Sequence, residues 1–452
     1  YIKKHASDVT EKYRLKYHLM PPVGWMNDPN GLVFYKGQYH VFYQFYPYDS
    51  VWGPMHWGHS VSNNLVLFHD CLVALAPDLE DESGCYSGGA IVDPNDPNRL
   101  YLYYTKHKEV DGVIEERQGI AWSDDGIHFN KKLVPIIDLD ETAPHGMTTD
   151  TRDPLPIYRD GYYYLLLGSI TPKRHGKILI YRSINAYDFE YHDEFTMDIF
   201  ENAMAECPSI SHYGNTDIFL FSTLYYDKVT KKNISYYVQG IFDFKEKKYL
   251  HSKPMLIDFG HHFYAPQTLV DDKDRIIMIA WMEMWESRKV THDLGHNWNG
   301  AMTFPRELKI INDKLHQYPV EEIKNYRTKR LELLNEMRIQ KSVDIEILDT
   351  AKDFSIHVCN SVNLVENFEI NYRNGIISVS GENIKLLPLE RVQCEDVIDH
   401  VCLRILIDTS SIEIFVNDGI AAFTSRIFMD CEEYTIQKSD SVIGLVYNLE
   451  IK

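Results

Sequence analysis

Stretches rich in aromatic and β-branched residues recur along the chain, and each has glycine, aspartate or asparagine before or within it. Five stretches are interpreted as strands or hairpins: residues 31–45, 98–107, 156–169, 216–226 and 274–283. Apolar runs of this length next to turn-forming residues are typical of β-strands. The pattern therefore predicts an all-β fold for this part of the chain.

The five stretches form a repeat. Their reference positions follow one another at intervals of about 60 residues: His40, Tyr101, Tyr163, Phe219 and Ile277. A period that contains several strands per unit is typical of the blades of a β-propeller. We therefore predict a five-bladed β-propeller around a central channel, formed by residues 1–320.

The character of the chain changes near residue 320. Residues 320–336 are charged and have helical spacing, so we expect a partly helical linker at 321–336. Shorter alternating strands follow, for example at 368–381 and 403–419. They predict a C-terminal β-sandwich at 337–452 with a structural or accessory role.

Within this second half, two Gly-containing segments look like hairpin turns, at 373–375 and 417–419. The half contains no constellation of acidic residues comparable to that of the repeat. We expect its carboxylates Asp408 and Glu413 to be turn and surface groups.

The chain is acidic, because 46 Lys and Arg stand against 66 Asp and Glu, for a formal net charge of −20 in 452 residues. Nucleic acids and anionic membranes favour basic surfaces, so we expect neither as a partner. No run approaches the roughly 18 apolar residues of a membrane span.

The seven cysteines are scattered, with no CxxC pair, which disfavours a disulfide framework or a zinc site. The single glycosylation sequon, at Asn233, is too common by chance to argue for secretion. We expect a cytoplasmic protein. Secretion after removal of a signal peptide is the alternative.

Acidic residues occupy equivalent positions of the repeat. Asp28, Asp153 and Glu206 each precede a reference position by a similar distance, and Ser87 and Ala265 hold the comparable positions of the second and fifth units. If this position lies on the innermost strand of each blade, all five residues point at the channel. Crowding like charges in a pocket is costly, which indicates a functional reason.

Taken alone, the stretch GWMNDPNG at 24–31 is ordinary turn chemistry, with Asp28 as a turn residue. The repeat favours a catalytic role instead. Two carboxylates that face each other across a pocket are the usual machinery for cleaving a glycosidic bond. Burial of Glu206 in its apolar stretch would raise its pKa and suit an acid/base. Turn N–H donors would keep Asp28 ionised, which suits a nucleophile, and Asp153 could bind sugar hydroxyls.

Aromatic and amide side chains near these positions suit a sugar site, since aromatic faces pack on sugar rings and amides bind hydroxyls. Trp52, in a polar loop, is the best candidate for a binding wall. Gln44 ends an apolar strand and is a candidate to bind a hydroxyl. For any single aromatic residue, the propeller core is the competing interpretation. Metalloprotease, Walker and dinucleotide-binding motifs are absent.

The chain resembles glycoside hydrolase family 32, which contains invertases, inulinases and sucrose-6-phosphate hydrolases. The resemblance rests on ordered motifs along nearly the whole chain: WMNDPNG (25–31), FYQ (42–44), WGHSVS (57–62), YSGGA (86–90), RDP (152–154), ECP (206–208), FYAPQT (263–268) and WNGAMTFPREL (298–308). It implies a five-bladed propeller with a β-sandwich and a retaining mechanism.

By the same resemblance, Asp28 would be the nucleophile that forms a covalent fructosyl-enzyme and Glu206 the acid/base. Asp153 would stabilise the transition state. The fructose site would be lined by Asn27, Gln44, Trp52, Tyr86, Ser87, Arg152 and Trp281. No metal or organic cofactor is implied.

Two departures from the family pattern, Phe45-Tyr46-Pro47 and Tyr86 where phenylalanine is common, bear on the leaving group. The expected activity is a β-fructofuranosidase acting on sucrose or related fructosides. Three alternatives remain open: an inverting propeller enzyme acting on arabinan or xylan, a fructosyltransferase of the same family and a non-catalytic sugar-binding propeller. A homodimer that narrows the funnel is a further candidate.

A phosphorylated sucrose would need a cationic rim. The candidates for this rim are Arg288, Lys289, His261, His262 and His292.

Overall fold

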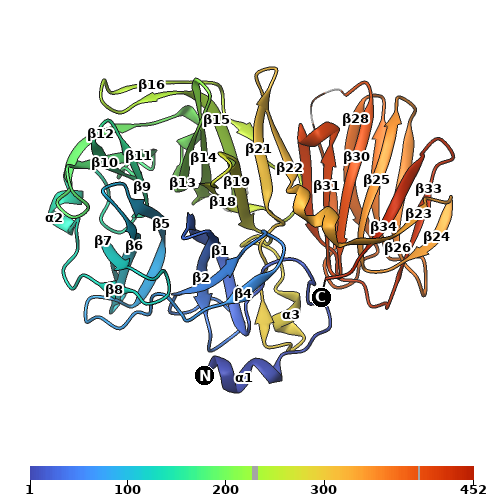
Figure 1. The fold of residues 1–452 in the computed structure, drawn as a ribbon, viewed down its shortest axis with the longest axis horizontal. Coiled ribbons are helices and arrows are strands. Elements are labelled where there is room, and N and C mark those ends of the chain that lie inside the picture. Colours follow the sequence, from blue (N-terminus) through green and yellow to red (C-terminus); the bar gives the residue numbers. More distant parts are fainter. Residues whose placement is uncertain (227–232, 395, 397, 452) are drawn as a thin grey trace.

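The structure is a computed structural model that describes residues 1–226, 233–394, 396 and 398–451. Most of these residues lie in β-strands, which confirms the all-β prediction. Figure 1 shows the strands of residues 24–319 on one side, in blue to yellow, and those of the C-terminal part on the other, in orange and red. No helix in the described part of the chain is long and apolar enough to cross a bilayer.

Described residues 24–319 form five sheets. The first contains β1 (Gly24–Tyr35), β2 (Gln38–Tyr46), β3 (His56–Ser62), β4 (Phe68–Asp70) and β20 (Trp298–Asn299). The second contains β5 (Gly84–Asp93), β6 (Asp96–Val110), β7 (Val113–Ser123) and β8 (Asn130–Lys131). The third contains β9 (Thr151–Arg159), β10 (Tyr162–Ile170), β11 (Gly176–Ser183) and β12 (Glu190–Phe195).

The fourth sheet contains β13 (Ala203–Tyr213), β14 (Thr216–Tyr225), β15 (Ile234–Asp243), β16 (Lys248–His251) and β17 (Met255–Leu256). The fifth contains β18 (Tyr264–Val270), β19 (Ile276–Trp281), β21 (Arg306–Ile311) and β22 (Lys314–Pro319). Two short helices precede β1: α1 (Ile2–His5) and the 3-10 helix η1 (Ala6–Asp8). Others lie between strands: α2 (Leu139–Thr142), α3 (Val290–Asp293), and the 3-10 helices η2 (Asp198–Phe200), η3 (Glu321–Tyr326) and η4 (Asn417–Gly419).

The five sheets are arranged in a ring through their first strands. β1 lies against β5 and β18, β9 lies against β5 and β13, and β13 lies against β18. The chain also returns to its start, because β20 pairs with β1 in parallel, with Gly24 opposite Trp298. The five reference positions of the repeat all fall in the second strand of a sheet: β2, β6, β10, β14 and β19. The repeat inferred from the sequence is therefore confirmed.

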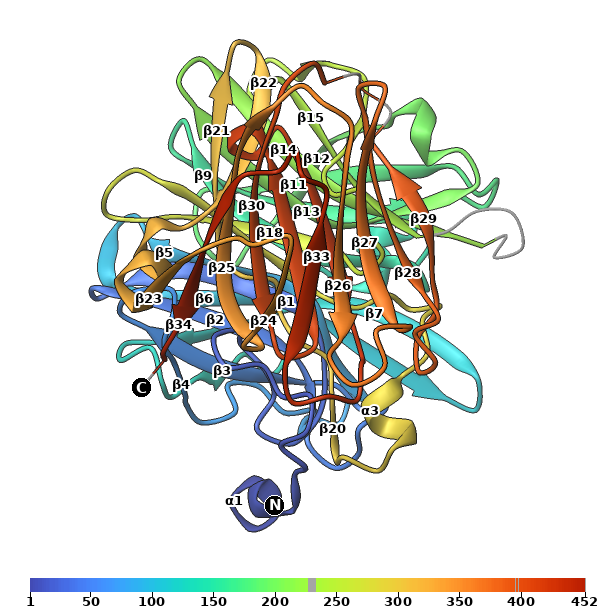
Figure 2. The same cartoon turned by 90° about the vertical axis from the view of Figure 1, so that its right-hand side faces the viewer.

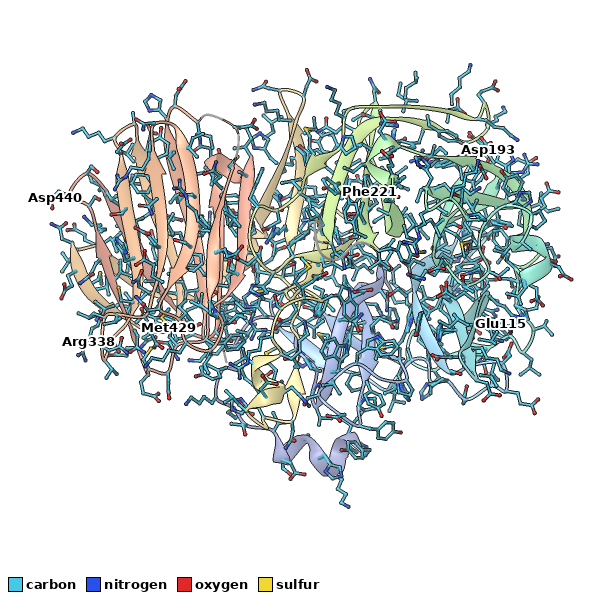
Figure 3. All side chains as sticks on the ribbon, turned by 180° about the vertical axis from the view of Figure 1, so that it is seen from behind. Glu115, Asp193, Phe221, Arg338, Met429 and Asp440 are labelled. Atoms are coloured by element: carbon cyan, nitrogen blue, oxygen red, sulfur yellow. The ribbon has the colours of Figure 1, made fainter. Side chains whose placement is uncertain are left out.

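Apolar side chains fill the space between neighbouring sheets. Phe221 of β14 is fully buried and packs on Phe200, with ring centroids 5.0 Å apart. Figure 3 shows Phe221 inside this part, whereas Glu115 and Asp193 point outward at its edge. Inner strands such as β14 have continuous apolar runs, because both faces of their sheet are covered.

The C-terminal part is built from two six-stranded sheets of described residues. One contains β23 (Arg327–Glu332), β34 (Gly444–Leu449), β25 (Ser342–Thr350), β30 (Val401–Asp408), β31 (Ser411–Val416) and β32 (Ala421–Arg426). The other contains β24 (Glu336–Ile339), β33 (Tyr434–Lys438), β26 (Phe354–Asn360), β27 (Asn367–Arg373), β28 (Ile376–Glu382) and β29 (Leu389–Gln393). Figure 2 views this part face-on, with its red and orange strands in front of the blue and green sheets.

The two sheets share one apolar core, to which β25 contributes Val343 and β26 contributes Ile356 and Val358. Asn374 and Gly375 both have positive φ and join β27 to β28 as a two-residue hairpin, as predicted. The segment 417–419 joins β31 to β32 in a second hairpin.

The structure agrees with the predicted linker 321–336 only in its first half. Residues Glu321–Tyr326 form η3, but Arg327–Glu332 form β23, which pairs with β34 through Leu331 and Val446. β23 is an edge strand with mostly exposed side chains. Charged residues are normal on such an edge because they discourage further pairing, so the charge pattern indicated a linker where a strand forms.

The expectation that Asp408 and Glu413 are turn and surface groups is wrong. Both side chains are fully buried and hold His18, whose Nδ1 lies 2.8 Å from Asp408 and whose Nε2 lies 2.9 Å from Glu413. Arg306, from β21, donates to Glu413 as well. These ion pairs connect the N-terminal part to the sandwich. His18 and Asp408 are 390 residues apart in the sequence, so a local sequence pattern does not reveal their contact.

The His18 contacts lead to a stability prediction. Burial alone would lower the pKa of His18, but its hydrogen bonds to Asp408 and Glu413 outweigh burial and raise the pKa. Stabilisation by a group with a raised folded-state pKa is complete below its unfolded pKa of about 6.5 and is lost as pH rises through the folded value. His18→Gln should therefore cost about 3–5 kcal/mol of unfolding free energy at pH 6, and less at pH 9.

Chemical denaturation at both pH values measures the difference. His5→Gln is the matched control, because His5 pairs with Asp8 at the surface. An H18Q cost that is equal at both pH values would contradict a charged His18.

Candidate active site

The five equivalent positions of the repeat lie on the five first strands, and each lies at or next to a break in strand register. Pairing with the second strand shifts between Met26 and Pro29 in β1, and between Tyr86 and Gly88 in β5. Comparable shifts occur in β9, β13 and β18 next to Asp153, Glu206 and Ala265. A β-bulge turns a side chain away from its regular direction and is common near active sites.

The prediction of a turn at Asp28 is wrong, because residues Gly24–Tyr35 form one strand with two register shifts. The same tripeptide, Asp-Pro-Asn, recurs at 96–98 in a different role. There, exposed Asp96 accepts a hydrogen bond from the backbone N–H of Asn98, at 3.1 Å. Pairing with β2, and not the local tripeptide, decides what Asp28 does.

Positive φ angles occur at three of these breaks: 63° at Asp153, 48° at Cys207 and 50° at Ala265. Such a backbone conformation is costly for residues other than glycine and is concentrated at functional sites. The strain therefore lies where the acidic side chains are presented.

A cavity of about 460 Å³ opens at the first strands of four sheets, β1, β5, β9 and β13. It is lined by nine of the ten predicted site residues: Asn27, Asp28, Gln44, Trp52, Tyr86, Ser87, Arg152, Asp153 and Glu206. Residues separated by more than a hundred positions in the sequence are thus brought together, and the three carboxylates share one space.

Trp281 is the exception. It is fully buried, between Trp25 and Trp285, with centroid distances of 5.8 Å and 4.9 Å. Trp285 lines the cavity in its place. The prediction took the last residue of β19 as the wall, whereas the chain bends after β19 and places Trp285 over Trp281.

The Asp28 carboxylate is buried and has two unequal oxygens. Its Oδ2 accepts a hydrogen bond from Ser87 Oγ at 3.0 Å and lies 3.7 Å from the Cys207 thiol. Its Oδ1 has no hydrogen-bond partner among the described residues. One oxygen is therefore fixed by the protein while the other keeps its lone pairs.

The pKa of Asp28 is higher than that of an ordinary aspartate. Burial raises the pKa of Asp28 to about 6, and the negative charge of Glu206 adds to this. Hydrogen bonds from Asn27, Ser87 and Cys207 act in the opposite direction. The expected ionised state is reached above about pH 6, and these side-chain groups, not a turn, favour it.

Cys207 connects the three carboxylates. Its backbone N–H donates to Asp153 Oδ2 at 2.8 Å, its thiol lies 3.5 Å from the same oxygen, and it directly follows Glu206. Burial raises the pKa of Asp153 to about 7, partly offset by Arg152. Asp153, Asp28 and Glu206 are therefore one interacting charge cluster.

Glu206 is held by the guanidinium of Arg152, from β9, and the hydroxyl of Tyr264, from β18. Arg152 donates to its Oε1 from Nη2 at 2.8 Å and from Nε at 3.2 Å. The Tyr264 hydroxyl donates to Oε2 at 2.7 Å. Both carboxylate oxygens have partners, so the side chain has a defined position on the cavity wall.

The opposite wall is aromatic. Tyr86 is stacked on His107, with centroids 4.0 Å apart and planes inclined by 8°, and Trp52 meets Tyr86 edge-on at 5.9 Å. Trp52 is 46% exposed. Gln44 is buried and donates to the Cys85 carbonyl at 3.1 Å. A half-exposed aromatic rim above buried polar groups suits a ligand with both apolar faces and hydroxyls.

Several cavity residues were missed: His107, Ile114, Glu116, Thr149, Asp150, Leu224, Asn233 and Trp285. A sequence signal existed for two of them. The Asp111-Gly112 turn closes the β6–β7 hairpin with Val110 opposite Val113, and this register places His107 opposite Glu116. The sequon residue Asn233 is buried, at 1% exposure.

None of the five candidates for a cationic rim lines this cavity. Arg288, His261 and His262 line a neighbouring cavity between the two parts of the chain. Lys289 donates to the Met284 carbonyl, and His292 pairs with Ser50. Among the described residues, Arg152 is the guanidinium of the active-site cavity.

Comparison with known families identifies the family of the chain. The sequence model described as "Glycosyl hydrolases family 32 N-terminal domain" matches residues 18–319, and "Glycosyl hydrolases family 32 C terminal" matches residues 313–452. The chain belongs to glycosyl hydrolase family 32. It is therefore a glycosidase, and the resemblance found in the sequence is confirmed.

Relatives of this glycosidase extend over nearly its whole length. It is 33% identical to the raffinose invertase of Escherichia coli over 91% of this chain and 89% of the relative. It is 32% identical to the sucrose-6-phosphate hydrolase of Bacillus subtilis (strain 168) over 94% and 91%.

Solved structures show the same fold. A GH32 beta-fructofuranosidase of Bombyx mori, a variant of which was solved in complex with sucrose, superposes with a TM-score of 0.87. That comparison has 31% identity and covers 100% of this chain and 97% of the other. The sucrose-6-phosphate hydrolase of Lactobacillus gasseri superposes with a TM-score of 0.90 at 26% identity, covering 99% and 96%.

The contacts of Asp28 generate a prediction for the family 32 glycosidase. Ser87→Ala removes a hydrogen bond that favours ionised Asp28, so the pKa of Asp28 should rise. The resemblance found in the sequence implies that Asp28 is a nucleophile, and a carboxylate nucleophile must be ionised. On that prediction the acidic limb of the kcat/KM profile should move to higher pH, by about one unit.

The pH profile of hydrolysis measures this shift. Ser83→Ala is the matched control, because the Ser83 hydroxyl donates to the Glu109 carbonyl outside the cavity. An S87A acidic limb identical to that of the unmodified enzyme would show that Asp28 does not set it.

Proposed function

We propose that the chain is a β-fructofuranosidase that releases terminal β-D-fructofuranosyl residues by a retaining mechanism. The proposed substrates are sucrose and related fructosides: sucrose-6-phosphate, short fructo-oligosaccharides and inulin-type fructans. One observation carries the proposal: Asp28, Asp153 and Glu206 converge on one cavity, tied together by Cys207. The names of the relatives, which are invertases and sucrose-6-phosphate hydrolases, support it.

In the first step, Asp28 attacks the anomeric carbon C2 of the fructosyl residue. Asp28 lines the cavity, and Ser87 holds its carboxylate in place through Oδ2. Glu206, as a protonated acid, gives its proton to the glycosidic oxygen while the bond from C2 to that oxygen breaks. The products are a covalent fructosyl-enzyme and the free leaving sugar.

In the second step, Glu206 acts as a base and takes a proton from water. The water oxygen bonds to C2 as the bond from C2 to Asp28 breaks, which restores both carboxyl groups to their starting states. Asp153 accepts hydrogen bonds from fructose hydroxyls, and these strengthen as positive charge develops on the ring. Arg152 keeps Glu206 aimed at the glycosidic oxygen through the two hydrogen bonds described above.

For the architecture, we propose that the five sheets are the blades of a five-bladed propeller, with the sandwich as an accessory domain. The division would be 1–320 for the catalytic propeller, with η3 as the connection and a sandwich that begins at β23. Support comes from the ring of first strands and from the β20–β1 pairing that closes it. On this view the cavity is the funnel at the propeller axis.

Two alternatives use the same cavity. Fructosyl transfer would occur if a sugar hydroxyl replaced water in the second step, and product analysis at high sucrose concentration separates it from hydrolysis. Inversion of configuration, as in an enzyme acting on arabinan or xylan, predicts the α-anomer of the sugar as the first product. A non-catalytic sugar-binding propeller is disfavoured, because all three carboxylates are present and placed together.

Kinetic measurements determine which fructoside the enzyme prefers. Comparing kcat/KM for sucrose, sucrose-6-phosphate, kestose and inulin ranks the proposed substrates. We further propose a cytoplasmic location, supported by free thiols at Cys71, Cys85 and Cys207. A homodimer stays a prediction that a solution mass measurement tests.

The central prediction concerns Asp28→Asn. The amide is no nucleophile, so sucrose hydrolysis should fall by at least about 10³-fold in kcat with the fold intact. Asp96→Asn is a closely matched control, because it changes the aspartate of an identical Asp-Pro-Asn tripeptide at an exposed position. Initial rates of glucose release measure both, and D28N activity equal to that of D96N would refute the proposed nucleophile.

A further inference from the structure

Arg152 does not serve Glu206 alone. Its Nη2 and Nε bind Glu206, while its Nη1 lies 3.2 Å and 3.3 Å from the two oxygens of Glu116. The guanidinium therefore lies between two carboxylates. The side chain is 13% exposed and lines the cavity.

Glu116 is held as firmly as the guanidinium. It lies in β7, is 1% exposed, and its Oε2 also accepts the backbone N–H of Thr151 at 2.9 Å. Thr151 directly precedes Arg152, so Glu116 fixes both the backbone and the side chain at this point of β9. Its own backbone N–H donates to the Thr148 carbonyl at 2.8 Å. A buried carboxylate with these partners is costly unless its charge is used.

The charge of Arg152 is thereby shared. Burial alone would lower the pKa of Arg152, but Glu116, Glu206 and Asp153 outweigh burial and raise it well above its usual value. A guanidinium favours the ionised form of a carboxyl group that it faces, and a second carboxylate next to the guanidinium opposes this effect. The acid/base has to be protonated for the first step, so an unshared cation at 2.8 Å would oppose catalysis.

The charged and titratable groups that face this assembly come from every neighbouring strand. Around Glu206 they are Asp28 from β1, Arg152 and Asp153 from β9, Cys207 from β13 and Tyr264 from β18, with Tyr226 and Asp150 beyond Arg152. Around Glu116 they are Arg152, His107, whose Nδ1 lies 3.6 Å away, and Tyr86. In this set, Glu116 is at hydrogen-bond distance from Arg152 Nη1, and Asp150 lies farther from the same nitrogen, at 3.8 Å.

We propose that Glu116 is a positioning residue that holds Arg152 between two carboxylates and so keeps Glu206 available as a proton donor. The proposal rests on the acid/base role proposed for Glu206, and it assigns to Glu116 a role in the pH range of the reaction. Glu116, which also lines the cavity, acts through Arg152.

The test is the pH dependence of kcat and kcat/KM for sucrose in four variants. Glu116→Gln and Glu116→Ala remove the charge. Arg152 then keeps Glu206 and the more distant Asp150, 3.8 Å from its Nη1, and the basic limb should move to lower pH by about one unit. Glu116→Asp keeps the charge, so its basic limb should stay near that of the unmodified enzyme although kcat falls. Glu115→Gln is the control, since Glu115 pairs with Arg117 and does not line the cavity.

The outcomes separate charge from structure. A basic limb that moves in E116Q and E116A, but not in E116D or E115Q, supports the proposal. A basic limb unchanged in E116Q and E116A, or moved equally in E116D, would overturn it and leave Glu116 a packing residue. Circular dichroism shows whether E116Q folds. If the amide next to the guanidinium prevents folding, E116A replaces E116Q in the comparison. Absence of sucrose hydrolysis by the unmodified enzyme would instead refute the proposed function.

Discussion

The site depends on burying three carboxylates close together while neighbouring donors compensate their mutual repulsion. Asp28, Asp153 and Glu206 are all less than a tenth exposed, and each carboxylate raises the cost of ionising its neighbours. The compensation is local: the Cys207 N–H and thiol, the Ser87 hydroxyl, the Tyr264 hydroxyl and one guanidinium. These donors come from four strands, β5, β9, β13 and β18, and removing any of them leaves a buried charge without compensation.

Larger features of the fold serve this cluster. The bulges of the first strands direct the side chains into the cavity, and the β20–β1 pair ties the last part of the N-terminal half to the strand that carries Asp28. The sandwich is attached through His18, Arg306 and the buried carboxylates Asp408 and Glu413. Arg306 begins β21, which pairs with β19 in the fifth sheet. The second half of the chain thus stabilises the sheet behind Trp281 without contributing a group to the active-site cavity.

The part of the site that could be predicted from the sequence is the part that belongs to the repeat. The equivalence of Asp28, Ser87, Asp153, Glu206 and Ala265 came from a period, and the structure places all five on first strands. Asp28 in a turn was wrong because its tripeptide has no intrinsic preference that survives pairing with β2. Trp281 was misplaced because a bend after β19 cannot be inferred from an apolar run. Asp408 and Glu413 were misassigned because their partners lie far away in the chain, whereas the Asp-Gly hairpin could have paired His107 with Glu116.

The covalent fructosyl bond to Asp28 is the central claim, and trapping it is the most direct test. Glu206→Gln enzyme mixed with β-fructofuranosyl fluoride needs no acid for the first step, because fluoride leaves unaided, but it lacks the base for the second. The account predicts a mass gain of one fructosyl unit on the proteolytic peptide that contains Asp28, and none in the enzyme that also carries Asp28→Asn. An unmodified Asp28 peptide, or the same mass gain on the peptide that contains Asp153, would contradict it.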